Sequence, residues 1–281
     1  MGIEVASVPA VALGLASAVS WGAGDFSGGL ATRRAGAHAV VLASQVIGVV
    51  VLVGLATAFG EAPPPASRLG WAVLAGVAGA LGLLALYRAL AAGQMGVGAP
   101  VSAVLAPAVP LAAGVIVEGP PTPLQVGGFA LALAAVACLA APERGAGRAA
   151  RALALPVASG LCFGCFLVLI RLVGGVYWPL VVARLTALGL LGAWAGILGG
   201  VRVPTGAALG LAALAGVLDA GGNAFFVLAA EAGRLDVAAV LSSLYPAPTV
   251  ALAWVVLGER LSRLQAAGVG AALAAIVCIA A

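Results

Sequence analysis

Asp219 is the residue whose type and position point most clearly to chemistry. It lies in the middle of a long apolar stretch, 205–232, with Asn223 four residues later and two glycines between them. Glycine lets a backbone or a bound solute approach closely. A carboxylate in apolar sequence suits proton coupling or the binding of a cationic group. The alternative is a structural ion pair with Arg184, which lies at a similar depth in the preceding apolar stretch. Both interpretations hold if a proton or a substrate competes with Arg184 for Asp219.

Four further charges lie near the ends of apolar stretches and predict two ion pairs. Asp25 and Arg88 are opposite in sign and similar in depth, and Arg171 and Glu231 form a corresponding set at the other end. As pairs they would gate a central site from its two mouths, with Arg184 tuning it. The alternative for Arg171 and Glu231 is that they extend their charged ends to the interface. Asp25 is too short for that, so we favour a functional or structural pair for it.

Aromatic and hydroxyl side chains complete the predicted substrate site. Two of them lie at matched positions of separate stretches, and three lie beside a pair of prolines that predicts a bend in 236–257. A proline bend exposes backbone carbonyls to a cavity. The alternative is ordinary packing or contact with lipid. These five residues are Trp21, Phe163, Tyr245, Ser242 and Ser243.

The sequence offers no catalytic, metal or cofactor site. Cys162 and Cys165 have the spacing of a metal or redox pair, but they lie in an apolar stretch with no second pair. A structural zinc site needs four ligands, usually cysteine and histidine. His38, the one histidine of the chain, follows two arginines in a loop. We therefore expect no metal, no cofactor and no enzymatic activity.

The composition identifies the broad class of the protein. Of its 281 residues 64% are hydrophobic and 8% are charged, and the formal net charge is +4. Soluble domains carry about 25% charged residues, so a soluble protein of this composition could not cover its surface. The few basic residues are scattered, which excludes nucleic-acid binding as a main role. The composition predicts an all-helical integral membrane protein.

Ten apolar stretches are each long enough to cross a bilayer as a helix, which takes about 20 residues. The breaks between them carry arginine, glutamate, glycine and proline, as turns do. The expected spans are 8–30, 37–59, 68–92, 96–117, 122–141, 152–172, 177–200, 205–232, 236–257 and 262–281.

An internal repeat divides the ten expected spans into two halves. At an offset of 140 residues, Leu74–Val77 recurs as Leu214–Val217, and 122–141 is identical to 262–281 at ten of twenty positions. Because each half has five spans, an odd number, the second half must enter the membrane in the opposite direction. Inverted repeats are typical of secondary transporters. We predict a five-helix repeat in 1–141, a linker in 142–151 and a second repeat in 152–281.

The sequence resembles, over essentially its whole length, the EamA-type transporters of the drug/metabolite transporter superfamily. The resemblance is most specific over 257–262, Leu-Gly-Glu-Arg-Leu-Ser, with Gln265 and Gly268 after it. Ser242–Pro246, Trp21 with Gly22, and Arg184 fit the same pattern. The resemblance implies ten helices in two inverted halves, a central cavity and transport of small metabolites, often outward. It implies no particular substrate.

The sequence therefore predicts a transporter of small metabolites, of amino-acid-like or hydrophobic solutes, that exports them by alternating access. A channel-like facilitator and a membrane-embedded lipid-modifying enzyme are the alternatives. The expected partners are a small-molecule substrate, protons as a second candidate, and the lipid bilayer. Both a monomer and a homodimer remain open. The absence of lysine suggests a GC-rich bacterial source, so we expect a multi-pass protein of the bacterial inner membrane.

The orientation in the membrane is left open by two conflicting expectations. We call the side on which the first expected span begins face X, and the opposite side face Y. The resemblance implies that face X is cytoplasmic. Most arginines between the expected spans, however, lie at face Y, and the positive-inside rule would make that face cytoplasmic.

Overall fold

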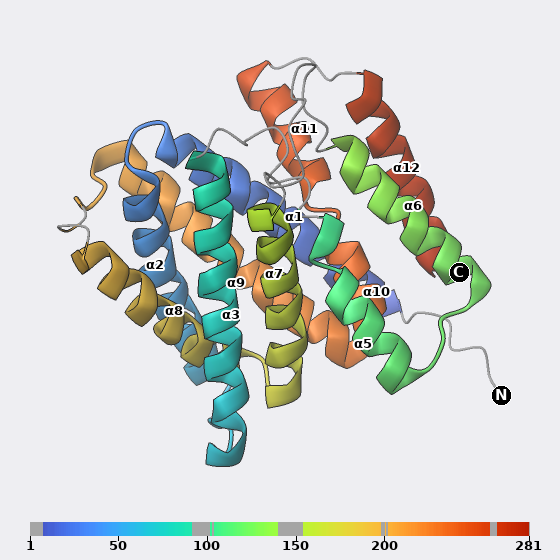
Figure 1. The fold of residues 1–281 in the computed structure, drawn as a ribbon, viewed down its shortest axis with the longest axis horizontal. Coiled ribbons are helices and arrows are strands. Elements are labelled where there is room, and N and C mark those ends of the chain that lie inside the picture. Colours follow the sequence, from blue (N-terminus) through green and yellow to red (C-terminus); the bar gives the residue numbers. More distant parts are fainter. Residues whose placement is uncertain are drawn as a thin grey trace.

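The structure, a computed structural model, describes residues 8–91, 102, 104–139, 154–197, 200, 202–258 and 263–280. Regular secondary structure in these residues is helical, which confirms the all-helical prediction (Figure 1). The helices are α1 (Val8–Thr32), α2 (Ala37–Ala58), α3 (Ala66–Ala91), α5 (Ala108–Glu118), α6 (Pro123–Leu139), α7 (Ala154–Val173), α8 (Tyr177–Ile197), α9 (Gly206–Ala232), α10 (Leu235–Ser242), α11 (Pro246–Leu257) and α12 (Arg263–Ala280).

The described helices follow the ten expected spans closely. Eight spans correspond to one helix each, the fourth ends in α5, and the ninth is divided into α10 and α11. Within the described residues six stretches are long and apolar enough to cross a membrane: α7, α8 and α9 over their full length, most of α2 and α3, and the run from α10 to α11. The protein is an integral, multi-pass membrane protein.

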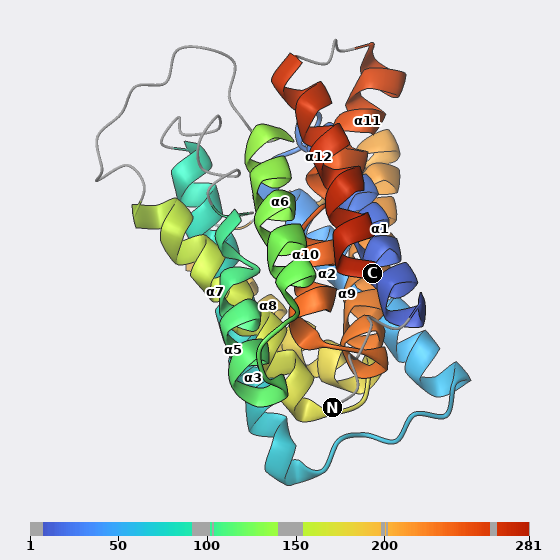
Figure 2. The same cartoon turned by 90° about the vertical axis from the view of Figure 1, so that its right-hand side faces the viewer.

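The main helix contacts join the first half of the chain to the second. Helix α1 packs along α9, α3 along α7, and α6 along α12, while α2 contacts both α8 and α9. Figures 1 and 2 show α6 and α12 side by side at one edge of the bundle, away from α2 and α8. Neither half could form this bundle alone, because most of its close neighbours come from the other half.

The surface of the bundle is apolar, as contact with lipid requires. Large aliphatic side chains such as Val50, Ile116, Val255 and Val277 are exposed on the outer sides of their helices. The interior contains many alanines, and small residues let membrane helices approach closely. Apolar residues therefore lie on both sides of these helices, which is why hydropathy predicts the spans but not the buried face of each.

Proline interrupts the ninth span as the sequence predicts. Helix α10 ends at Ser242, and α11 begins at Pro246 after the cap residue Tyr245. Proline lacks a backbone N–H and excludes the carbonyl of the preceding turn. In the fourth span α5 likewise begins directly after Pro107. The break in the ninth span brings Tyr245 to the centre of the bundle.

Glu61, from the loop between α2 and α3, and Arg68, in the first turn of α3, bind the ends of two helices of the other half at face X. The Glu61 carboxylate accepts hydrogen bonds from the backbone N–H groups of Val176, Tyr177 and Trp178, at 2.8–3.3 Å, where α8 begins. Arg68 donates to the carbonyl of Val173, the last residue of α7, at 3.3 Å. Each charge has the sign that the helix dipole favours. These two side chains thus fix the α7–α8 connection.

Arg234 and Asp236 form a second polar contact at face X. Arg234 pairs with Asp236 at 2.7 Å and donates to the carbonyl of Gly119, which caps α5, at 2.8 Å. The Asp236 side chain is completely buried. A Cβ on Gly114 of α5 would lie 2.9 Å from the Cβ of Asp236, so α5 packs directly against this carboxylate.

Candidate functional site

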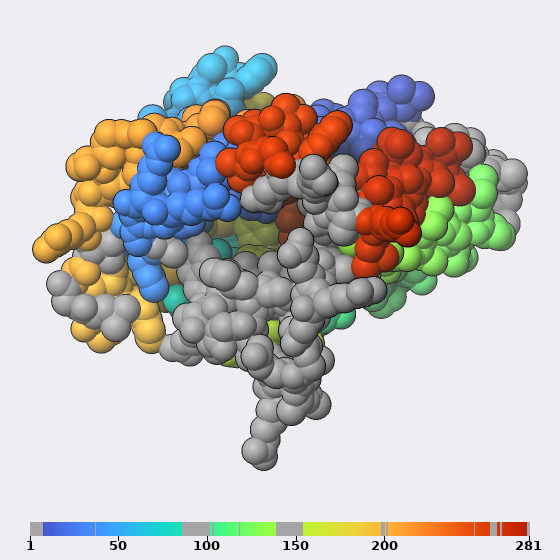
Figure 3. Space-filling view, turned by 90° about the horizontal axis from the view of Figure 1, so that it is seen from above, coloured from blue at the N-terminus to red at the C-terminus, as the bar shows by residue number. Residues whose placement is uncertain are grey.

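A cavity of about 290 Å³ lies at the centre of the bundle, between helices of both halves. Its lining runs along α8 from Leu180 to Leu191, which is about 16 Å at 1.5 Å per residue. Figure 3, seen from face Y, shows a hollow between α2 and α11 with deeper atoms at its floor. The polar lining residues are Asp25, Gln45, Ser102, Arg184, Asp219, Asn223 and Tyr245, and the aromatic ones include Trp21, Phe163 and Phe166.

Arg184 and Asp219 form an ion pair in the wall of this cavity. The guanidinium of Arg184 also donates to the side-chain carbonyl of Gln45, on α2, at 2.6 Å. Asn223, one turn after Asp219 on α9, donates to the Asp219 backbone carbonyl at 2.6 Å. The side chain of Arg184 is 7% exposed and that of Asp219 is 46% exposed. The pair therefore presents its carboxylate, rather than its guanidinium, to the open space.

Gly48 provides the space that Arg184 occupies. A Cβ on Gly48 would lie 2.6 Å from one terminal guanidinium nitrogen of Arg184 and 2.9 Å from the guanidinium carbon. Gln45 lies one turn earlier on the same face of α2. The second span thus supplies both the hydrogen-bond acceptor and the gap that hold the arginine toward Asp219.

Asp25 lines the same cavity from α1. It makes no hydrogen bond or ion pair with any side chain in the part of the chain that the structure describes. The predicted partner, Arg88, has its backbone in α3, but its side chain lies outside the described residues. The predicted Asp25–Arg88 pair therefore stays a prediction.

Aromatic rings form one side of the cavity around Trp21. Trp21 stacks on Phe226 with ring centroids 6.1 Å apart, and Tyr245 meets it edge-on at 6.5 Å. Phe163 lines the cavity from α7, where it faces Gly82 of α3. Trp21, Phe163 and Tyr245 thus lie around one cavity together with Asp219, Asn223, Arg184 and Asp25. That these residues bind a substrate is still a prediction.

Ser242 and Ser243 are not among the residues that line this cavity, and their part in a substrate site stays a prediction. Both are buried, with 0% and 5% exposure. Ser242 donates to the carbonyl of Gly14 on α1 at 3.4 Å, and Ser243 donates to the carbonyl of Val240 within its own turn at 2.7 Å. Successive helical residues point about 100° apart, so closeness to Tyr245 in the sequence does not place these hydroxyls on its side.

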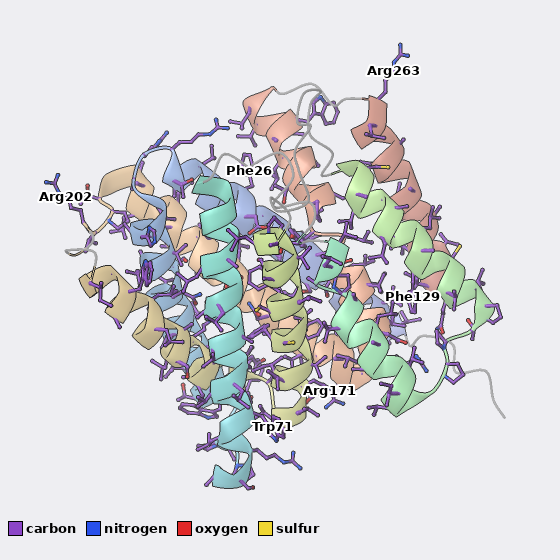
Figure 4. All side chains as sticks on the ribbon, viewed as in Figure 1. Phe26, Trp71, Phe129, Arg171, Arg202 and Arg263 are labelled. Atoms are coloured by element: carbon purple, nitrogen blue, oxygen red, sulfur yellow. The ribbon has the colours of Figure 1, made fainter. Side chains whose placement is uncertain are left out.

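The predicted pair of Arg171 with Glu231 is wrong as a contact. Arg171 donates instead to the backbone carbonyl of Ala230, at 3.3 Å, and Glu231 is exposed. Figure 4 shows Arg171 at the lower end of α7, far from Arg202 at the left edge and Arg263 at the top. The expected depth was suitable, but the two side chains point in different directions around their helices. The proposed gate at this mouth loses its ion pair.

Sequence analysis missed Gln45, Phe166 and the helix-end contact of Glu61. Gln45 could have been found, because it is a polar side chain inside an otherwise apolar span. Phe166 lies one turn from Phe163 on α7 and differs in no obvious way from packing phenylalanines. Glu61 lies in a loop, and its contact spans more than a hundred residues, so no local pattern predicts it.

No group of three or more histidine, cysteine, aspartate or glutamate side chains in the described ranges could hold a metal ion. The chemistry that the cavity offers is that of a charged pair, a further carboxylate, two amides, two hydroxyls and aromatic rings. These groups can recognise a small solute or exchange a proton.

Apolar helices that pack across two halves around a polar cavity are an architecture that membrane transporters use. The sequence model of the EamA-like transporter family matches residues 150–281. This match confirms the resemblance to the EamA-type transporters of the drug/metabolite transporter superfamily that is seen in the sequence.

The likeness of the fold extends over the whole chain. A solved structure, described only as a crystal structure of a protein, is 22% identical and superposes with a TM-score of 0.72, covering 96% of this chain and 95% of that one. At this identity the likeness concerns the fold alone. None of the curated proteins matches the chain.

Proposed function

We propose that the protein is a secondary carrier that exports small, amino-acid-like or hydrophobic solutes by alternating access, and that it has no enzymatic activity. The observation that carries the proposal is the central cavity, in which the Arg184–Asp219 pair faces aromatic rings. Ligand sites are commonly apolar pockets with a few well-placed polar groups. In inverted-repeat transporters the substrate site lies near the midplane, between the repeats.

The pattern of helix contacts supports an inverted repeat. Exchanging each helix with its expected counterpart in the other half turns the α1–α9 contact into the α7–α3 contact, and α2–α9 into α8–α3. The α2–α8 and α6–α12 contacts are unchanged by the exchange, as contacts on a two-fold axis would be.

Close glycine contacts support the same repeat in finer detail. Gly76 of α3 packs against Ala183 and Thr186 of α8, and Gly216, 140 residues later, packs against Ser44 and Ile47 of α2. In a second set, Gly82 faces the Phe163 ring and Gly222 faces the Trp21 ring. The matched positions of these two aromatic residues in the sequence thus correspond to matched partners in space.

The test is solute counterflow with the purified protein in liposomes. A thermal-shift screen against amino acids, nucleosides and cationic drugs first selects a solute that stabilises the protein. A carrier then accumulates the labelled solute transiently against a preloaded unlabelled pool, with a rate that saturates. A channel-like facilitator, the alternative, gives flux without counterflow. Flux without counterflow for the stabilising solute would contradict the proposal.

A further inference from the structure

The charges that line the cavity do not balance within the described residues. Arg184 contributes one positive charge, which its ion pair with Asp219 neutralises. Asp25 adds a second carboxylate, and no described side chain of opposite charge pairs with it. Asp25 is exposed, so its carboxylate is open to a partner of opposite charge inside the cavity. We propose that the cavity takes solutes that carry an ammonium group, and that Asp25 binds this group. This inference rests on the transport function proposed above and names its substrate class.

Trp21 gives the same wall of the cavity a second preference for cations. Trp21 and Asp25 lie four residues apart on α1, so they share a face of the helix. Both line the cavity. The face of an indole ring attracts an ammonium group, and the attraction is larger where water is excluded. Phe226 and Tyr245 pack against Trp21 and hold the ring in place.

Two hydrogen-bond acceptors that receive no hydrogen bond from the described residues add to the recognition of an ammonium group. Asn223 and Tyr245 also line the cavity, and neither the side-chain carbonyl of Asn223 nor the hydroxyl of Tyr245 forms a hydrogen bond within the described part of the chain. The amide nitrogen of Asn223 is already used on Asp219. An ammonium group has up to three N–H donors and no acceptor. Asp25, Asn223 and Tyr245 together offer three acceptors to such a group.

The rest of the lining fits a small apolar body on the ammonium group. Leu83, Phe163, Phe166 and Leu167 supply aliphatic and aromatic surface. The volume of about 290 Å³ is at the lower end of the range of small-molecule pockets, which is about 300–1,000 Å³. A monoamine with one aromatic ring is of suitable size and polarity. An acidic solute that lacks an ammonium group would, by contrast, bring only like charge to Asp25.

The experiment compares two probes of nearly equal shape, 2-phenylethylamine and 2-phenylethanol, which differ in an ammonium against a hydroxyl group. Their dissociation constants are measured by calorimetry on the full chain in nanodiscs. We expect the amine to bind about tenfold or more tightly, since a hydrogen bond to a charged group is stronger than a neutral one. Asp25→Asn should remove this preference, and Asp25→Glu should keep most of it. Glu231→Gln, which removes an exposed carboxylate away from the cavity, should leave the ratio unchanged.

Each outcome decides a separate question. Equal affinities in the wild-type protein, no binding of the amine, or an unchanged preference in folded Asp25→Asn would overturn the inference and leave the carrier proposal standing. The wild-type comparison needs no variant, so it decides even if Asp25→Asn fails to fold. Counterflow of labelled 2-phenylethylamine then tests the carrier itself. Tight, Asp25-dependent binding without counterflow would contradict the transport proposal and not the assignment of the ammonium site.

Discussion

Two arginine–aspartate pairs of this protein use the same chemistry in different surroundings. In the cavity, Arg184 and Asp219 come from α8 and α9, and the carboxylate is 46% exposed to open space. At face X, Arg234 and Asp236 lie two residues apart, and the carboxylate is completely buried against α5. The buried carboxylate has no room for another partner, whereas the cavity carboxylate can exchange its arginine for a proton or a solute. The exposure of the acid, more than its ion pair, distinguishes the functional candidate from the structural contact.

The largest effect is expected at the structural pair. Asp236→Ala leaves Arg234 without its carboxylate in a tightly packed site, and breaking a buried pair in this way costs about 3–5 kcal/mol. We expect a corresponding loss in the free energy of unfolding in mixed micelles, with much less folded protein in the membrane. Replacing both residues by leucine should cost less than Asp236→Ala alone, since no charge is then left unpaired. Near-wild-type stability of Asp236→Ala would show that the Arg234–Asp236 pair is not needed for stability, which would remove the difference between the two arginine–aspartate pairs.

Mutation of the cavity pair should reduce transport and leave the stability of the protein nearly unchanged. Asp219→Asn keeps the shape of the side chain and removes its charge, so we expect transport to fall about a hundredfold while the protein stays folded. The measurement is counterflow in liposomes, with the thermal transition as the check on folding. Transport at the wild-type rate across the pH range would show that the pair is structural, as in the alternative considered from the sequence.

The sequence predicted the helices well because a membrane span needs little more than length and hydropathy. It also indicated Arg184 as a partner of Asp219 in one of two interpretations of that carboxylate, because two charges at equal depth in neighbouring spans have few other choices. The same argument failed for Arg171 and Glu231. The depth of a side chain in the membrane follows from counting residues along the span. The direction in which it points around the helix axis depends on which face of the helix packs against its neighbours. With apolar residues on both faces, the sequence does not reveal that rotation.

Local spacing does not place Ser242 and Ser243 in the cavity beside Tyr245, because their hydroxyls donate to backbone carbonyls in the packed interior. Gln45 was within reach of sequence reasoning, since a lone polar side chain in an apolar span is a candidate by its type. The role of Gly48 was not, because a glycine gap is visible only beside the guanidinium that fills it. Contacts between the two halves required the folded structure.

A variant at Gly48 should change the cavity pair without touching either charge. The side chain in Gly48→Val would occupy the space of the Arg184 guanidinium, which lies 2.6 Å from a Cβ at this position. Displacing the guanidinium separates it from Asp219 and Gln45, so we expect counterflow to fall about tenfold, the equivalent of one charged hydrogen bond. Gly54→Val on the same helix is the matched control, because a Cβ there meets nothing within 4 Å. An equal loss in both variants would mean that α2 merely tolerates no larger residue.

The smallest effect is expected from the loop that joins the halves at face X. Glu61→Gln keeps the size of the side chain but removes the charge from the start of α8, where a negative charge contributes about 1 kcal/mol. A weaker contact between the α2–α3 loop and α8 should favour opening at face X severalfold.

The readout is the reaction of Leu83→Cys in the cavity with an impermeant thiol reagent, after replacement of the four native cysteines. Labelling of Arg263→Cys, exposed at face Y, shows which face is outside in each preparation. Glu231→Gln is the control, because it removes a carboxylate near the same face that binds no helix end. Faster labelling from face X alone would mean that Glu61 helps to hold this side closed. If access rises equally from both faces, the loop stabilises the bundle as a whole. Glu61 would then be a structural contact of face X, as the Arg234–Asp236 pair is, and not part of a gate.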